Sequence, residues 1–277
     1  MTSRPETETA PCPTCGQEIP PRTGPDRPAR RCSESCEQAA HRSAASFTVG
    51  DGYAIYQGPS WDSGPHRHAA FQITVAVHGH AAMLDAAGTR HSAAALLVPP
   101  MARHRMLTTA DLRILYIEPH CAYADRLRRR CGSGITAVPE LRHLGEDDIR
   151  SAGTGPSDRL DPRLLAAMRA LADGPVPVPE LAAHVGVSPQ RLRGLARSQL
   201  GMPLTRWRVW NQLRRTVEEV RAGRSLADAA TASGFADQAH LTRWMREMMG
   251  LTPAAVLPLL RLPAADGDVH RNRSGDR

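Results

Sequence analysis

Apolar positions recur with different spacings along the chain. Between Phe47 and about Glu118, short apolar runs such as FQITVAV, AALLVPP and LRILYIEP are broken by glycine and proline, which is typical of β-strands. From Ala122 to Asp173 the pattern turns helical, and after a Pro/Gly linker at 173–179 it is helical again until about Leu262. The pattern predicts a multidomain α+β protein in which a strand-rich region precedes an all-α region.

The segment ELAAHVGVSPQRLRGLARSQL, residues 180–200, predicts two short helices joined by a tight turn. Gly186 permits the turn, Ser188 is a suitable N-cap for the second helix, and Pro189 fits its first position. This is the arrangement of a helix-turn-helix unit.

The same arrangement returns further along the chain. SLADAATASGF, residues 225–235, predicts a short helix and a turn, and Asp237 is a suitable N-cap for a longer helix that stops at Gly250. One long helix over PLTRWRVWNQLRRTVEEVRAG, residues 203–223, lies between the two units. We therefore expect an all-α domain with two helix-turn-helix units.

The second helix of each unit has an apolar side and a polar side. Apolar residues at helical spacing predict the core, whereas glutamine, threonine and arginine recur on the other side. Arginine can bond guanine bidentately and glutamine can bond adenine, so these side chains suit the reading of base edges. The residues expected in the core are Leu181, Leu192, Leu226, Phe235, Leu241 and Met245.

Charge supports an acidic partner for the all-α region. The 277-residue chain has a net charge of +7 and a pI of about 9.6, and residues 178–262 hold 12 arginines against 6 acidic residues. A basic patch gains affinity for phosphates through counterion release. No apolar run approaches the roughly 20 residues of a membrane span, and the N-terminus lacks the apolar core of a signal peptide. A cytoplasmic protein without a membrane partner is expected.

The segments GFADQAHLTRWMREMMGLTP and, more weakly, SPQRLRGLARSQLGMPL resemble the DNA-binding domain of AraC/XylS-family transcription regulators. The resemblance covers about residues 178–262 and implies two recognition helices on one face of double-stranded DNA, with RNA polymerase and a second copy of the chain as further partners. Trp244, Ala196 and Gly194 depart from the family pattern. Gly194 stands where the family often has a polar side chain that contacts DNA, so base reading by the first unit is expected from Gln190 and Arg193. The expected DNA-binding residues are Gln190, Arg193, Arg197, Gln238, Ala239, Thr242, Arg243 and Arg246.

The strand-rich region resembles cupins, which are small β-barrels with a metal site. The stretch PHRHAAFQITVAVHGHAAML places His66, His68 and Gln72 in order, and PPMARH adds His104. His66 and His68 are two residues apart and are expected on one face of a strand, and His104 is expected to meet them from a different strand. Gln72 stands where cupins usually have glutamate, and Met101 where they usually have glycine. We expect these four side chains to line the pocket of a small-molecule effector, and the spacing leaves a second metal ion in this pocket open.

Four of the six cysteines are paired near the N-terminus, in the order Cys12, Cys15, Cys32 and Cys36. Two close pairs separated by a turn-rich loop can surround Zn²⁺ with four thiolates. The end of this segment, RRCSESCEQAAHR, resembles small bacterial zinc fingers, so a structural zinc in a zinc-ribbon-like module is expected. Cys121 and Cys131 remain and are expected to be ordinary half-buried thiols.

A transcription regulator that responds to a small effector, and not an enzyme, is the function that these features favour. Two alternatives stay open: a metal-dependent cupin enzyme with an attached DNA-binding domain, and a cysteine-based redox or metal sensor. The expected domains are a zinc-finger-like module (1–45), a cupin-like sensor barrel (46–121), a helical linker or dimer region (122–173), the AraC-type DNA-binding domain (174–262) and a disordered tail (263–277).

Overall fold

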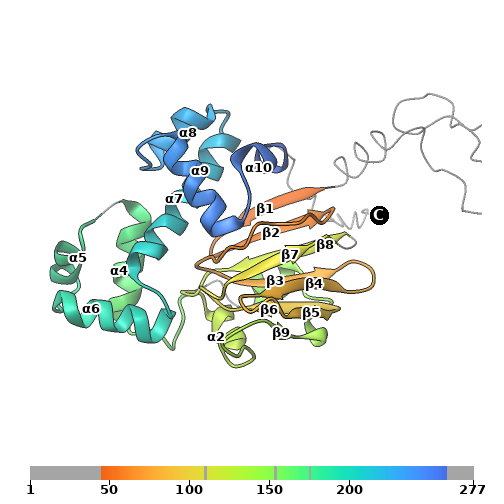
Figure 1. The fold of residues 1–277 in the computed structure, drawn as a ribbon. Coiled ribbons are helices and arrows are strands. Elements are labelled where there is room, and N and C mark those ends of the chain that lie inside the picture. Colours follow the sequence, from red (N-terminus) through yellow and green to blue (C-terminus); the bar gives the residue numbers. More distant parts are fainter. Residues whose placement is uncertain (1–44, 109–110, 153–154, 175, 261–277) are drawn as a thin grey trace, which may run out of the picture. The chain divides into compact units, whose positions relative to one another are not determined.

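The computed structural model describes residues 45–108, 111–152, 155–174 and 176–260, and the elements below all belong to one unit of the chain, Ser46–Arg277. A strand-rich half precedes a helical half (Figure 1), as the sequence predicted. The strands are β1 (Ser46–Gly50), β2 (Tyr53–Gly58), β3 (Phe71–Ala76), β4 (Ala81–Asp85), β5 (Arg90–Ala93), β6 (Ala95–Val98), β7 (His104–Leu107), β8 (Leu112–Ile117) and β9 (Thr136–Ala137).

These strands form two antiparallel sheets. Six strands pair in the order β1-β2-β8-β3-β6-β9, and three pair in the order β5-β4-β7. Because successive side chains of a strand point to opposite faces, Phe71, Ile73 and Val75 of the central strand β3 face one side, whereas Gln72 and Thr74 face the other. The polar side of β3 meets the smaller sheet, since the Gln72 amide contacts the Met106 sulfur on β7 at 3.4 Å.

The apolar side of β3 is covered by α2 (Ala122–Arg128) and α3 (Glu146–Ser151). Tyr123, Leu127 and Ile149 of these helices join Phe71 and Ile73 in one buried cluster. Residues 122–151, which the sequence placed in a helical linker, therefore also supply part of the core of the strand-rich half. They include β9, which pairs with β6, and a single 3₁₀ turn at Pro139–Leu141.

The helical half contains the two predicted units. The turn between α5 (Val178–His184) and α6 (Pro189–Leu195) contains Gly186, with a positive φ of 70°. The turn between α8 (Leu226–Ala232) and α9 (Gln238–Met249) contains Gly234, with a φ of 87°. None of the described helices is long and apolar enough to cross a membrane. The elements are α4 (Pro162–Asp173), α5 (Val178–His184), α6 (Pro189–Leu195), a π-helical turn η2 (Ala196–Leu200), α7 (Leu204–Arg221), α8 (Leu226–Ala232), α9 (Gln238–Met249) and α10 (Pro253–Leu260).

Candidate DNA-binding helices and histidine cluster

Helix α9 begins and ends where the sequence predicted. The Asp237 carboxylate accepts a hydrogen bond of 2.6 Å from the backbone N–H of His240, which satisfies one of the unpaired donors of the first turn. Gly250 ends the helix in the left-handed conformation, with a φ of 66°. These two caps set the bounds of α9 at Gln238–Met249.

The buried side of α9 consists of Leu241, Met245 and Met248. The predicted contact residues lie outside it. The Thr242 side chain is half-buried, and its hydroxyl donates to the carbonyl of Gln238 at 2.8 Å. The exposed members of the predicted set on this helix are Gln238, Ala239, Arg243 and Arg246.

Helix α6 has the same design over a shorter length. The Ser188 hydroxyl accepts from the backbone N–H of Arg191 at 3.1 Å, and Leu192 and Leu195 are buried. Gln190 and Arg193 are exposed on α6, whereas Arg197, also exposed, lies in the π-helical turn that follows. Gly194 is exposed as well, so this position of α6 offers no side chain to a partner.

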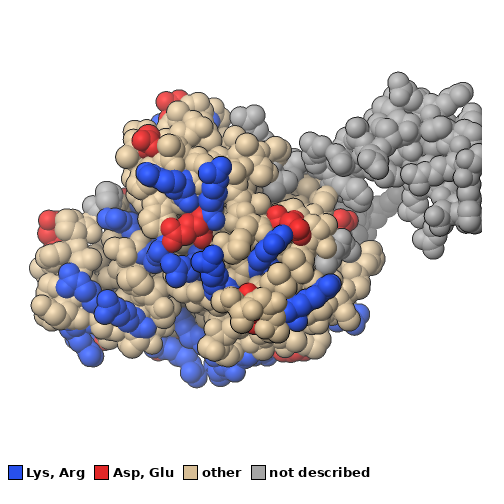
Figure 2. Space-filling view, in the orientation of Figure 1, with Lys and Arg blue, Asp and Glu red and all other residues tan. Residues whose placement is uncertain are grey.

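The arginines predicted to contact DNA on α6, η2 and α9 are available to a partner. Within the described ranges, Arg193, Arg197, Arg243 and Arg246 form no ion pair with an acidic side chain. Arginine side chains are scattered over the face drawn in Figure 2, and some of them lie on the part formed by α5 and α6 at the left. Exposed and unpaired guanidinium groups are the donors that phosphates and guanine edges require.

The four residues of the predicted effector pocket come together inside the strand-rich half. His66, His68 and His104 each place a ring nitrogen within 4.8 Å of the others, and all three are buried. The amide oxygen of Gln72 lies 2.7 Å from Nε2 of His68 and 3.2 Å from Nε2 of His104.

The expectation that His66 and His68 share one face of a strand is wrong. Both lie in the extended segment before β3, and His66 makes an isolated backbone bridge with His104, the first residue of β7. Hydrogen bonds of 2.9 Å and 3.0 Å join the two backbones in both directions. This bridge, and not pairing between regular strands, brings His66 next to His104.

The opposite ring nitrogen of each histidine is held by a backbone carbonyl. Nδ1 of His66 lies 2.9 Å from the Gly64 oxygen, Nδ1 of His68 lies 2.8 Å from the Ala70 oxygen, and Nδ1 of His104 lies 3.0 Å from the Ala102 oxygen. A carbonyl oxygen only accepts, so each Nδ1 carries the proton. In the neutral rings all three Nε2 atoms are therefore left with a lone pair.

Burial keeps these rings neutral. It lowers the pKa of His66 to about 3, with the neighbouring His68 adding to the shift, and it lowers the pKa of His68. Burial, together with His66 and His68, lowers the pKa of His104 well below its usual value. Neutral imidazole is the form that binds a metal ion, so the cluster fits the cation that its resemblance to cupins leaves open.

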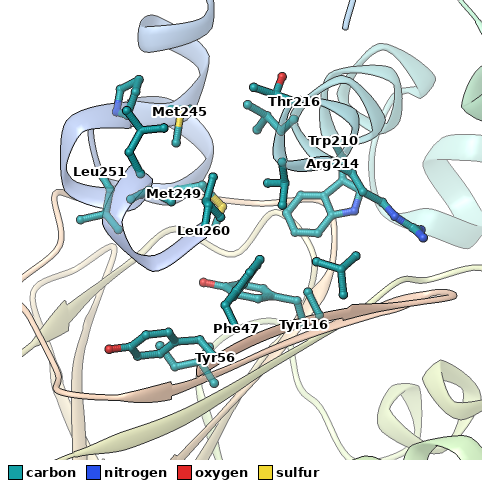
Figure 3. Close-up of a pocket in the computed structure, with 18 of the residues that line it drawn as sticks. Phe47, Tyr56, Tyr116, Trp210, Arg214, Thr216, Met245, Met249, Leu251 and Leu260 are labelled. Carbon is teal, nitrogen blue, oxygen red and sulfur yellow. The ribbon is translucent and has the colours of Figure 1, made fainter. Parts of the chain in front are cut away.

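An apolar cavity of about 120 Å³ lies between the six-stranded sheet and helices α7, α9 and α10 (Figure 3). Its polar groups are few: His66 and Ser63 contribute from the strand-rich half, and Glu118 and Arg214 also line it. The cavity therefore borders on the histidine cluster through His66. Among its apolar lining residues are Phe47, Tyr56, Tyr116, Trp210, Met245 and Leu260.

The sequence did not single out the contacts that join the two halves. The buried carboxylate of Glu118, just after β8, accepts from Trp210 Nε1 at 2.9 Å and from Arg214 at 3.1 Å. The available signal was a charged residue at the end of the apolar run LRILYI, with a tryptophan and an arginine one helical turn apart on α7. Neither feature indicates which residue the side chain will contact.

The two remaining cysteines have the properties of unreactive thiols. Burial raises the pKa of the Cys121 thiol to about 12 and raises the pKa of Cys131 as well. Since the thiolate is the reactive form, this disfavours a redox role for either residue. The cysteines predicted to bind zinc, Cys12, Cys15, Cys32 and Cys36, lie outside the described residues.

Comparisons with known proteins agree with the helical half. Residues 181–257 match a family described as a helix-turn-helix domain. No curated protein matches the chain. The chain therefore carries a helix-turn-helix domain.

Among solved structures, the fold is similar to that of ToxT from Vibrio cholerae O395, at 12% identity and a TM-score of 0.51, over 78% of this chain and 98% of ToxT. An apo form of a ToxT variant from Vibrio cholerae strain SCE256 gives 11% identity and a TM-score of 0.53, over 76% and 98%. Wild-type ToxT of that strain with an unsaturated fatty acid bound gives 12% and 0.50, over 79% and 97%. The chain shares with these proteins the order of a β-sheet domain followed by a helical domain.

Proposed function

We propose that the protein is a DNA-binding transcription regulator of the AraC/XylS type. The observation that carries the proposal is the pair of capped helices α6 and α9, each of which exposes glutamine and unpaired arginine side chains within the helix-turn-helix match. The long helix α7 joins the two units, so both recognition helices are presented by one scaffold.

The predicted contact residues fall into two groups, those that read bases and those that hold phosphates. Gln238 and Arg243 read base edges in the major groove, with Ala239 and Thr242 beside them on α9. Arg246 and Arg197 hold phosphates, which position the protein without selecting sequence. On α6, Gln190 and Arg193 supply the base contacts that Gly194 cannot make.

The strand-rich half is proposed to sense a small effector. The apolar cavity supports an effector that is itself largely apolar, and the fatty acid bound to ToxT, a protein of similar fold, supports the same class. His66, His68, Gln72 and His104 are too closely packed to enclose such a molecule among themselves, so it would meet them only through His66 in the cavity wall. Because residues from both halves line the cavity, a bound effector would contact the scaffold of the DNA-binding helices directly.

Three further proposals rest on the sequence. The N-terminal cysteines bind one structural zinc ion, so Cys32→Ser is expected to lower the zinc content by one ion per chain. The cupin-like barrel is supported by the two antiparallel sheets. RNA polymerase and a second copy of the chain are proposed as partners from the family resemblance.

Mapping the DNA bound by the full chain across the genome tests the proposal. A short sequence motif shared by the bound sites, and bound by the purified protein, is the expected result. Even coverage without a motif would mean that the arginines act as a general phosphate-binding surface, and sequence-specific regulation would then have to be abandoned.

A further inference from the structure

We infer that His66, His68 and His104 bind one divalent transition-metal ion, and that this ion holds residues 63–67 against the C-terminal end of α9. The metal site itself involves only residues of the strand-rich half. The link between the metal and DNA affinity rests on the proposed function.

The three histidines form a donor set that suits a metal ion. Nε2 of His68 and Nε2 of His104 both lie near the amide oxygen of Gln72, at 2.7 Å and 3.2 Å, and His66 places a ring nitrogen within 4.8 Å of the other two histidines. The Nδ1 of each ring is bonded to a backbone carbonyl, and a ring whose other nitrogen is fixed in this way is the usual form of a metal-binding histidine. Acceptors at such distances repel each other unless a cation lies among them or the amide is turned over.

The backbone around the histidines holds them in place without the ion. His66 and His104 are joined by two backbone hydrogen bonds, and the carbonyl of His68 accepts from the N–H of Met101 at 2.8 Å. Met101 has a φ of 65°, an unfavourable conformation for a residue with a side chain. Strained residues of this kind concentrate at functional sites, where the surrounding structure compensates for them.

The ligand chemistry selects the class of ion. Neutral imidazole nitrogens suit zinc, cobalt, nickel, copper and iron, whereas calcium and magnesium prefer sets of oxygen ligands. Within the described residues no carboxylate joins the cluster, so the three side chains contribute no negative charge. A divalent ion of the nitrogen-binding class is therefore the proposed ligand.

Residues 63–67 connect this site to α9. The N–H of Gly64 donates to the carbonyl of Gly250 at 2.9 Å, and the N–H of Arg67 donates to the carbonyl of Glu247 at 3.2 Å. His66 lies between these two contacts, and its Nδ1 would be 2.7 Å from a Cβ placed on Gly250. An ion that fixes His66 also fixes both neighbouring contacts to the helix that reads DNA.

Metal content tests the site. The full chain is stripped with a chelator, dialysed against excess Co²⁺ and then against buffer, and its cobalt is counted per chain. His66→Asn and His104→Asn keep a side-chain donor for the carbonyls of Gly64 and Ala102 and remove one Nε2 ligand each. His78→Ala, at an exposed histidine of the same half, is the matched control.

Each asparagine variant is expected to hold one cobalt ion fewer than wild type, and His78→Ala is expected to equal wild type. Any cobalt at the N-terminal cysteines is common to all these proteins and cancels in the difference. Equal cobalt in wild type and in both asparagine variants, all with an unchanged thermal unfolding midpoint, would overturn the site.

DNA affinity tests the link. Removal of the metal from wild type should change the affinity for a site recovered by genome mapping by at least about fivefold, and His66→Asn should show no such change. Gly250→Ala should abolish the response, because its Cβ would lie 2.4 Å from the Gly64 oxygen. Gly201→Ala is the matched control, since Gly201 also has a positive φ, 70°, but a Cβ there meets nothing within 4 Å.

If the cobalt measurement shows the site but DNA affinity is the same with and without metal, the link is wrong and the metal site is still supported. If no variant or wild-type protein binds DNA under any condition, the proposed function fails, and the cobalt measurement still decides the site.

Discussion

The indole N–H of Trp210 on α7 donates a hydrogen bond of 2.9 Å to the buried carboxylate of Glu118 in the strand-rich half. Arg214, one turn further along the same helix, donates to the same carboxylate and also to the carbonyl of Gly50 at 3.0 Å. Because α7 joins the two helix-turn-helix units, these contacts fix the scaffold of both recognition helices against the sheet.

Removal of this carboxylate should destabilise the protein. Glu118→Ala removes the acceptor of the Trp210 indole N–H and the buried carboxylate that pairs with Arg214, which keeps only its weaker contacts such as the Gly50 carbonyl. We expect a loss of about 2–4 kcal/mol in the free energy of unfolding. The control is Glu140→Ala, which removes an exposed ion pair with Arg130 and should cost less than about 1 kcal/mol. Urea unfolding measures both, and equal losses would contradict a structural role for Glu118.

The buried histidines should make the metal-free protein sensitive to acid. The unfolded chain protonates His66 below its ordinary pKa of 6.5, whereas the folded chain does so only near 3, so between these values the unfolded state binds more protons. Stability should therefore fall as the pH drops from 6.5 towards 3, by up to about 1.4 kcal/mol per pH unit for this one histidine.

The lowered pKa values of His68 and His104 act in the same direction. The measurement is unfolding by urea at several pH values with chelator present. His66→Asn should flatten the dependence and His78→Ala should leave it unchanged. An identical dependence in wild type and His66→Asn would contradict the burial of a neutral His66.

The cap of α9 should contribute measurably to stability. Asp237→Ala removes the acceptor for the backbone N–H of His240 and is expected to cost about 1 kcal/mol, whereas Asp237→Ser keeps an acceptor and should cost only a few tenths. Thermal unfolding of the two variants checks the order. If serine is no better than alanine, the carboxylate does not act as the cap.

Local signals in the sequence predicted the helical half well. Ser188 and Asp237 cap the helices that they were expected to cap, and Gly250 ends α9, because caps depend on a few neighbouring residues only. The convergence of His66 and His104 was predicted, and His104 does come from a separate strand, β7, whereas His66 and His68 lie outside the regular strands on which they were expected.

Contacts over long sequence distances were not predictable in the same way. Glu118 and Trp210 are 92 residues apart, and Gly64 meets Gly250 through backbone atoms that carry no residue-specific signal. These contacts depend on how the sheet and α7 pack, which no local pattern encodes.

The central claim is that α9 reads DNA sequence, and the binding of Arg243→Ala and Arg246→Ala to a recovered site and to scrambled DNA tests it most directly. Arg243→Ala should lose about 1–3 kcal/mol on the recovered site and much less on scrambled DNA, because it removes a base contact. Arg246→Ala should weaken both by similar amounts, because it removes a phosphate contact. Equal losses for Arg243→Ala on both DNAs would contradict base reading by α9.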